Sequence, residues 1–238
     1  MNSKFAIAAL AAALLTMGNA RAAEEESPWA GTASLGYLSS TGNTEAESLN
    51  AQATATYSVN GWVHNGFVSA QGSSTAGETT GERYQAQYKL DKDLSEKTYM
   101  FGRLSYDKDR FSGFDNTMSG TVGLGRRFVE TEKHLLKGEA GAGSRRQELD
   151  DGTTIQNVIF MGNLDYRYTI SENSEFTQTL LVEMGEDNNF TESVTKLKAN
   201  IVGSLALALS FTVKNNSNPP AGFEKTDTFT AIGLEYKF

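Results

Sequence analysis

Apolar and polar residues alternate at every second position along much of this chain. Residues 232–238 (IGLEYKF) show the pattern most clearly, with apolar side chains at the even positions and Gly, Glu and Lys between them. A β-strand sends successive side chains to opposite faces, so this segment predicts a strand with one apolar and one polar face. A strand of this kind that ends on an aromatic residue, here Phe238, is typical of the last strand of a transmembrane β-barrel.

Eleven further segments show the same alternation. The regular ones are 29–37, 49–57, 83–90, 157–168, 176–184, 196–201 and 205–214, and the less regular ones lie near 61–72, 97–107, 117–129 and 134–148. Long runs with the three- and four-residue spacing of amphipathic helices are missing. The chain is therefore predicted to be all-β, with about twelve strands.

Alternation alone does not separate a membrane barrel from a soluble antiparallel sandwich, because the strands of both have one apolar and one polar face. Two further features favour the barrel. Charged residues lie in mid-strand on the polar faces, whereas the apolar faces are nearly free of charge. Aromatic residues gather toward strand ends, as at Tyr57, Tyr168 and Tyr236, where an interfacial girdle would lie. We therefore expect a single transmembrane antiparallel up-and-down β-barrel.

The connections between the segments fall into a short set and a long set. The short set covers 58–61, 91–96, 130–133, 171–174 and 202–204, and begins with Asn60-Gly61, a strong hairpin signal. The long set covers 39–46, 72–81, 109–116, 149–154, 185–193 and 215–224. Outer-membrane barrels have short periplasmic turns and longer extracellular loops. With an even strand number, both termini are expected in the periplasm.

The N-terminal residues indicate export. Lys4 precedes an apolar run of eleven residues, 5–15, and Ala20-Arg21-Ala22 offers a small-x-small cleavage pattern. We expect a signal peptide over 1–22 and a barrel domain over 23–238, located in the cell outer membrane. The apolar run is too short for a spanning helix, which needs ~20 residues.

Composition excludes several classes of chemistry. Without the basic residues of the signal peptide, 19 basic residues remain against 29 acidic ones, a formal charge of −10. An acidic chain does not bind nucleic acid by charge, so no nucleic-acid partner is expected. The chain has no cysteine, which excludes disulfides, thiol catalysis and cysteine-based metal sites.

No catalytic residue, cofactor or metal site is predicted. The only histidines are His64 and His134, and Ser69 lies five residues from His64, on the opposite face of its strand. No Ser/His pair is evident. Acidic loops at 150–152 and 186–189 could offer oxygen ligands to calcium, but neither has the spacing of a known calcium loop.

The remaining source of function is the barrel lumen. Barrels of ~8 strands are filled by their own side chains and those of ~16–18 hold a water channel, so twelve lies between. Charged residues on the polar faces are the lumen-lining candidates. They are Arg83, Lys89, Arg103, Glu139, Asp165, Arg167, Glu183, Lys196 and Lys198, with Arg145, Lys214 and Glu235 beside them. They could line a narrow polar pore, or they could pair with one another and fill the lumen.

Two stretches resemble a known family. Residues 35–44 (LGYLSSTGNT) and 216–228 (NSNPPAGFEKTDT) look like the signature stretches of the YdiY-like, or salt-induced, outer-membrane proteins, a domain family of unknown function. The resemblance covers the whole mature chain. It implies a bacterial outer-membrane barrel and a loose link to salt or acid stress, with no established site residues.

Three functions follow as expectations. The first is a narrow passive pore for small solutes or ions, linked to salt or acid stress. The second is a structural or stress-response envelope barrel with a filled lumen and no transport, and an outer-membrane enzyme is the least favoured. The expected partners are outer-membrane lipid, lipopolysaccharide and the barrel assembly machinery, which would recognise the C-terminal strand ending at Phe238.

Overall fold

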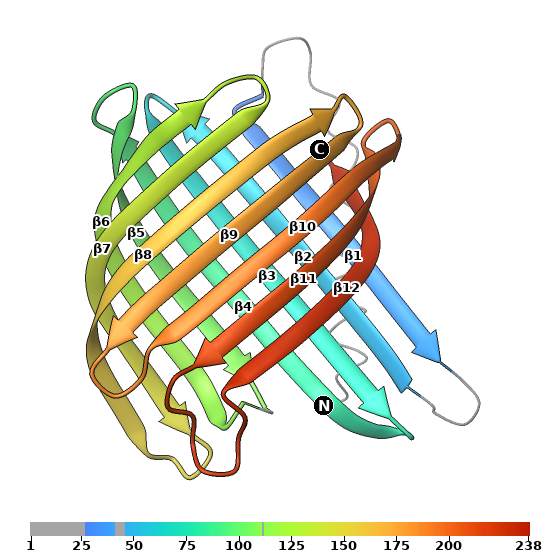
Figure 1. Ribbon diagram of the computed structural model, residues 1–238, viewed down its shortest axis with the longest axis vertical. Helices are drawn as coiled ribbons and strands as arrows, with labels where there is room; N and C mark the ends of the chain where they lie inside the picture. Colours follow the sequence, from blue (N-terminus) through green and yellow to red (C-terminus); the bar gives the residue numbers. More distant parts are fainter. Residues whose placement is uncertain (1–26, 41–45, 111) are drawn as a thin grey trace.

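Twelve antiparallel strands close on themselves in the computed structural model, which describes residues 27–40, 46–110 and 112–238 (Figure 1). The expected signal peptide lies outside the described residues. Each strand pairs with its neighbours in sequence, and the last pairs with the first. The strands are β1 Trp29–Ser40, β2 Ala46–Val59, β3 Trp62–Thr75, β4 Glu78–Asp93, β5 Thr98–Asp109, β6 Phe114–Glu130, β7 His134–Leu149, β8 Thr154–Ser171, β9 Ser174–Gly185, β10 Phe190–Val202, β11 Leu205–Asn216 and β12 Thr226–Lys237. The prediction of an all-β barrel with twelve strands is confirmed.

The last residue of the chain takes part in barrel closure. Gly31 and Phe238 exchange two backbone hydrogen bonds of 3.0 Å, which extend the pairing of β1 with β12. The ring of Phe238 lies directly over Gly31, where an added Cβ would come within 2.5 Å of it. Glycine at position 31 therefore lets the terminal ring lie flat against the first strand.

Short turns join the strands at one end of the barrel, here called the short-turn end, at 60–61, 94–97, 131–133, 172–173 and 203–204. The C-terminus lies at this end, which is uppermost in Figure 1. Asn60 (φ 49°) and Gly61 (φ 72°) both adopt positive φ, as a two-residue type I′ hairpin requires. The Asn-Gly signal in the sequence is thus confirmed.

The opposite end, here called the long-loop end, is less loop-rich than predicted. The predicted loop 72–81 is wrong, because the connection is much shorter. β3 ends at Thr75 and β4 begins at Glu78, so only Ala76-Gly77 forms the turn. The expected loop 185–193 shrinks to 186–189, because β10 begins at Phe190. In both places the polar residues that predicted a loop belong to paired strands. Backbone hydrogen bonding between strands does not require apolar side chains.

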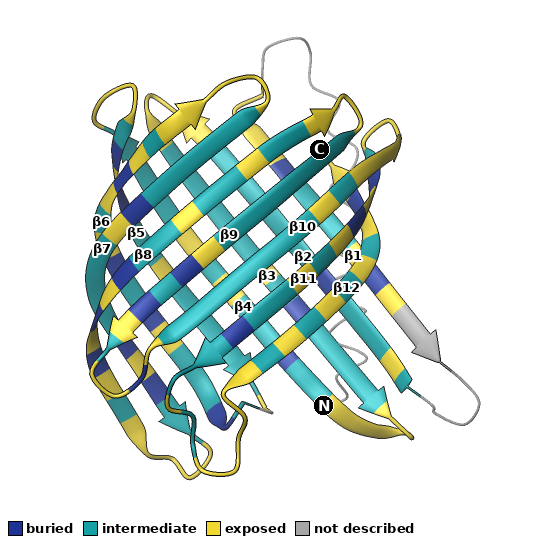
Figure 2. Ribbon diagram, in the orientation of Figure 1, coloured by how far each residue is buried: buried dark blue, intermediate teal, exposed yellow. Residues whose placement is uncertain are grey.

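The outer face of the barrel is apolar. Val158, Val122 and Leu104 are 71%, 69% and 63% exposed, and exposed positions recur along the strands of Figure 2. A closed barrel with such a band is built to face lipid. No helix in the described part of the chain is long and apolar enough to cross a bilayer.

Aromatic side chains gather on this outer face near the short-turn end. The rings of Trp29 and Tyr57 lie 4.7 Å apart between centroids, and Tyr57 continues to His64 at 5.9 Å. The aromatic girdle predicted from the strand ends is therefore present on this wall, and it includes a histidine.

Candidate functional site: the barrel lumen

A polar cavity of about 400 Å³ occupies the lumen on the side of the long-loop end. Its lining carries five basic residues (Arg83, Arg103, Arg145, Lys196, Lys214) and five acidic ones (Asp107, Asp109, Glu183, Glu192, Asp227). Amide and hydroxyl side chains of β1–β4, such as Gln52, Ser69 and Gln87, line the remainder of one wall. Because basic and acidic residues are equal in number, we expect the cavity to have no strong preference for cations or for anions.

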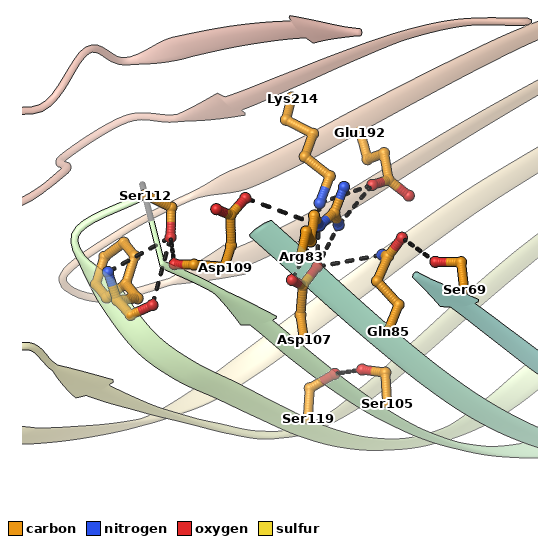
Figure 3. A network of polar contacts seen from close by, with 11 residues as sticks. Ser69, Arg83, Gln85, Ser105, Asp107, Asp109, Ser112, Ser119, Glu192 and Lys214 are labelled. Carbon is orange, nitrogen blue, oxygen red and sulfur yellow. Dashed lines mark hydrogen bonds and ion pairs between the residues drawn. The ribbon is translucent and has the colours of Figure 1, made fainter. Parts of the chain in front are cut away.

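Ion pairs cross the lumen inside this cavity, as Figure 3 shows. Arg83 of β4 binds Asp107 of β5 through both Nε and Nη2, and Lys214 of β11 reaches the same carboxylate at 3.0 Å. Glu192 of β10 lies 3.8 Å from Arg83 Nη2 and 3.3 Å from Lys214 Nζ. These four residues, here called the lumen bridge, tie β4 and β5 to β10 and β11. Asp109 approaches Arg83 Nε at 3.9 Å.

A second group centres on Glu183 of β9, whose side chain is buried. Arg103 and Arg145 each approach a Glu183 oxygen at 3.4 Å, and Ser119 Oγ donates to it at 3.2 Å. Arg145 is 1% exposed and also donates to the backbone carbonyl of Asn188. One carboxylate therefore serves two guanidinium groups from β5 and β7.

Two more ion-paired groups lie closer to the short-turn end, and of their members only Lys196 reaches the cavity lining. In one, Lys89 binds Glu139 and lies 3.0 Å from Asp91, and Tyr99 Oη donates to Glu139 at 2.7 Å. Asn163 and Asp165 continue this group, with Asn163 Nδ2 donating to Asp165 at 2.8 Å.

The other group contains both predicted lysines of β10. Lys196 binds Glu235, and Lys198 lies 3.1 Å from Glu175 and 3.5 Å from Glu235. The polar faces of β9 and β10 would suggest that Lys198 pairs with Glu183 on the adjacent strand, but this pairing does not form. The register places Lys198 opposite Glu175, whereas Glu183 lies opposite Phe190 near the other end of the strand.

An apolar cluster also projects into the lumen. Tyr99, Phe101, Met161 and Leu181 pack together from β5, β8 and β9, and Phe190 packs against them. Lys89 Nζ lies 5.3 Å from the ring centroids of both Tyr99 and Phe101. The half of the lumen toward the short-turn end is thus narrowed by packed rings and paired charges.

The structure divides the nine predicted lumen residues between these groups. Arg83, Arg103, Glu183 and Lys196 line the cavity, and Lys89, Glu139, Asp165 and Lys198 lie beyond it. Arg167 lies on the same strand face as Asp165, is exposed, and sits close to the short-turn end.

Sequence reasoning missed four of the five acids of the cavity: Asp107, Asp109, Glu192 and Asp227. Asp107 and Asp109 share the parity of Arg103, and Glu192 shares that of Lys196, so a longer reading of the same alternation would have found them.

The residues considered for catalysis or metal binding do not come together. His64 and His134 pair with Tyr88 and Tyr166 through Nδ1 at 2.7 and 2.9 Å on the outer face, whereas Ser69 donates to Gln85 in the lumen. Within residues 27–40, 46–110 and 112–238, no group of three or more candidate ligands could hold a metal ion.

The two acidic loops instead stabilise local structure. Asp151 Oδ1 accepts a hydrogen bond of 2.8 Å from the Thr153 backbone N–H, which lowers the pKa of the Asp151 carboxyl below its usual range. Asn188 is buried and binds Asn216 and the backbone N–H of Asn218, which docks the 186–189 loop against the 217–225 loop.

Fold and lumen together define a class: a twelve-stranded β-barrel of the outer-membrane type with a polar, ion-paired interior. The chain belongs to the family described as "Protein of unknown function, DUF481", whose model matches residues 33–238. It is 29% identical over 215 residues to the "Uncharacterized protein YdiY" of Escherichia coli (strain K12), an alignment that covers 90% of this chain and 85% of that protein.

Solved outer-membrane proteins share the fold. The NanC porin has a TM-score of 0.56 at 12% identity and covers 88% of this chain with 100% of its own. An outer membrane channel from Pseudomonas putida F1 has a TM-score of 0.54 at 11% identity, covering 92% of this chain and 98% of that chain. At these identities the likeness concerns the fold alone.

Proposed function

We propose that this protein resides in the bacterial outer membrane and is a narrow channel for small polar solutes or ions. The observation that carries the proposal is the cavity of about 400 Å³, which is lined by ten charged residues and by amide and hydroxyl side chains. A barrel that served only as a scaffold could fill this space with apolar side chains at lower desolvation cost. The membership in a barrel family and the likeness to porin and channel folds support the choice.

The lumen bridge sets the expected conductance. Asp107 and Lys214 lie 3.0 Å apart across the cavity, so a solute must pass beside this pair or separate it. Because the lining charges balance, we propose weak selectivity between cations and anions. Neutralising Lys214 leaves four bases against five acids and should favour cations, whereas neutralising Asp107 should favour anions.

Planar-bilayer recordings of the refolded protein test this function. We expect small, resolvable current steps in the unmodified protein, and opposite shifts of reversal potential under a salt gradient for Lys214→Gln and Asp107→Asn. Lys198→Gln is the matched control, because Lys198 lies outside the cavity lining and pairs near the short-turn end. Absence of steps in correctly folded protein, including the bridge variants, would refute the channel.

A structural barrel with a filled lumen is the second candidate. The cluster of Tyr99, Phe101, Met161 and Leu181 favours it, because these rings and chains narrow the lumen beyond the cavity. Under this alternative, the Phe101→Ala variant would show no current steps in planar bilayers, whereas in a channel the substitution should raise the conductance. A role in salt or acid stress remains part of the proposal, tested by comparing the growth of a deletion strain in high salt and at low pH.

A further inference from the structure

An apolar groove of about 550 Å³ runs along the outer wall of the barrel across β6–β9. Ala140 and Gly162 form its floor, the Phe128 ring lies over Gly138, and Leu124 and Leu164 line its sides. An added Cβ at Gly162 would meet nothing within 4 Å, so the floor is open at that position. The groove is therefore a gap in the side-chain layer that elsewhere meets lipid.

The Phe128 ring lies directly over Gly138 on the neighbouring strand. A Cβ at Gly138 would lie 2.6 Å from Phe128 Cε2, so only glycine lets this ring lie against the strand. The strand is irregular here, with a register shift between Arg127 and Val129. The ring remains 56% exposed on the outer face. The groove wall is thus built by backbone features and is not a chance gap between flexible side chains.

Arg126 lines the same groove near the short-turn end of β6. Its neighbour Arg127 turns inward, pairs with Asp93 at 2.8 Å and lies 5.1 Å from the Tyr99 ring centroid. Arg126 faces outward and is exposed, and no carboxylate of the described chain lies in ion-pair range of it. A cation on a lipid-facing wall is costly unless it reaches the interface and an anion there.

We propose that this groove is a binding site for one anionic phospholipid. The acyl chain lies over Gly162, beside the Phe128 ring, and the phosphate pairs with Arg126. An empty groove in a bilayer would forfeit dispersion contacts, so a lipid chain fills it. The cation selects the headgroup by charge complementarity. In the predicted orientation the short-turn end is periplasmic, so the lipid belongs to the periplasmic leaflet.

A single tryptophan beside the groove reports on the bound lipid. Phe128→Trp is introduced together with Trp29→Phe and Trp62→Phe, which removes the two native tryptophans. The protein is refolded into phosphatidylcholine vesicles that contain brominated phosphatidylglycerol or, at equal mole fraction, brominated phosphatidylcholine. We expect the relative affinity derived from quenching to be about five-fold higher for phosphatidylglycerol than for phosphatidylcholine. This ratio corresponds to the contribution of one interfacial cation to the binding of an anionic lipid.

Matched variants separate the headgroup from the chain. Arg126→Gln should remove the preference for phosphatidylglycerol and Arg126→Lys should keep it. Gly162→Leu should fill the floor and reduce quenching by both lipids. Gly102→Leu should not, because Gly102 is also an outward glycine with open space but lies outside the groove.

A second reporter fixes the location. Leu209→Trp, on β11 and 46% exposed in the native protein, should show no headgroup preference. Equal quenching by the two lipids at Phe128→Trp, an unchanged preference in Arg126→Gln, or the same preference at Leu209→Trp would each overturn the proposal.

Discussion

Replacing Glu183 with Gln should destabilise the barrel strongly, because this one carboxylate neutralises two guanidinium groups. Its side chain is 4% exposed, Arg145 is 1% exposed and Arg103 is 13% exposed. Removing one partner of a buried ion pair leaves an uncompensated charge and typically costs ~3–5 kcal/mol. Glutamine keeps the shape and one carbonyl acceptor for Ser119, so the measured loss reports mainly on the charge.

The matched control is Glu175→Gln on the same strand. Glu175 is 30% exposed and lies 3.1 Å from Lys198, which keeps a second carboxylate, Glu235, at 3.5 Å. A pair this accessible is worth about 0–1 kcal/mol. The two substitutions have identical chemistry and differ in burial and in the number of partners.

Urea titration of both variants in lipid vesicles, followed by tryptophan fluorescence, measures the difference in free energy of unfolding. Trp29 and Trp62 both lie on the outer barrel wall away from Glu183, so the signal itself is unchanged by either substitution. Equal losses for Glu183→Gln and Glu175→Gln would refute the reasoning, because water in the lumen would then screen both sites alike.

Four further outcomes are expected. Leu209→Arg places a charge on the lipid face and should cost ~2–4 kcal/mol in the same titration, and a neutral result would mean that the wall faces are reversed. Phe238→Ser should lower the yield of heat-modifiable, membrane-inserted barrel, since it removes the ring over Gly31, whereas full assembly would contradict this role. Ala76→Asn should raise the free energy of unfolding by about 0.5–1 kcal/mol, because Ala76 has φ 50° and Asn tolerates that backbone better. A cysteine at position 221 of intact cells should react with an impermeant maleimide and one at Asn60 should not, and the reverse pattern would invert the topology.

The period-two pattern alone determined which residues face lipid and which face the lumen. Leu207 and Lys196 could be assigned to opposite faces from sequence because strand geometry is local and each residue reverses the direction of its side chain. The twelve strands were predicted for the same reason. The Asn60-Gly61 hairpin was predicted from its turn residues, and the closing role of the last strand from its terminal aromatic residue. The ends of the strands were less well determined, because a polar residue such as Glu192 can lie either in a loop or on the lumen face of a strand.

Only the closed barrel decided which lumen residues meet. Asp107 and Lys214 are separated by 107 residues, and their contact depends on the diameter and stagger of all twelve strands. The same holds for Met161 and Leu181, apolar residues at lumen positions that join Tyr99 and Phe101 from another strand. Alternation assigns a face to a residue but carries no information about distance across the lumen. The sequence therefore determined the wall of this barrel, and the tertiary closure determined whether its interior is filled or open.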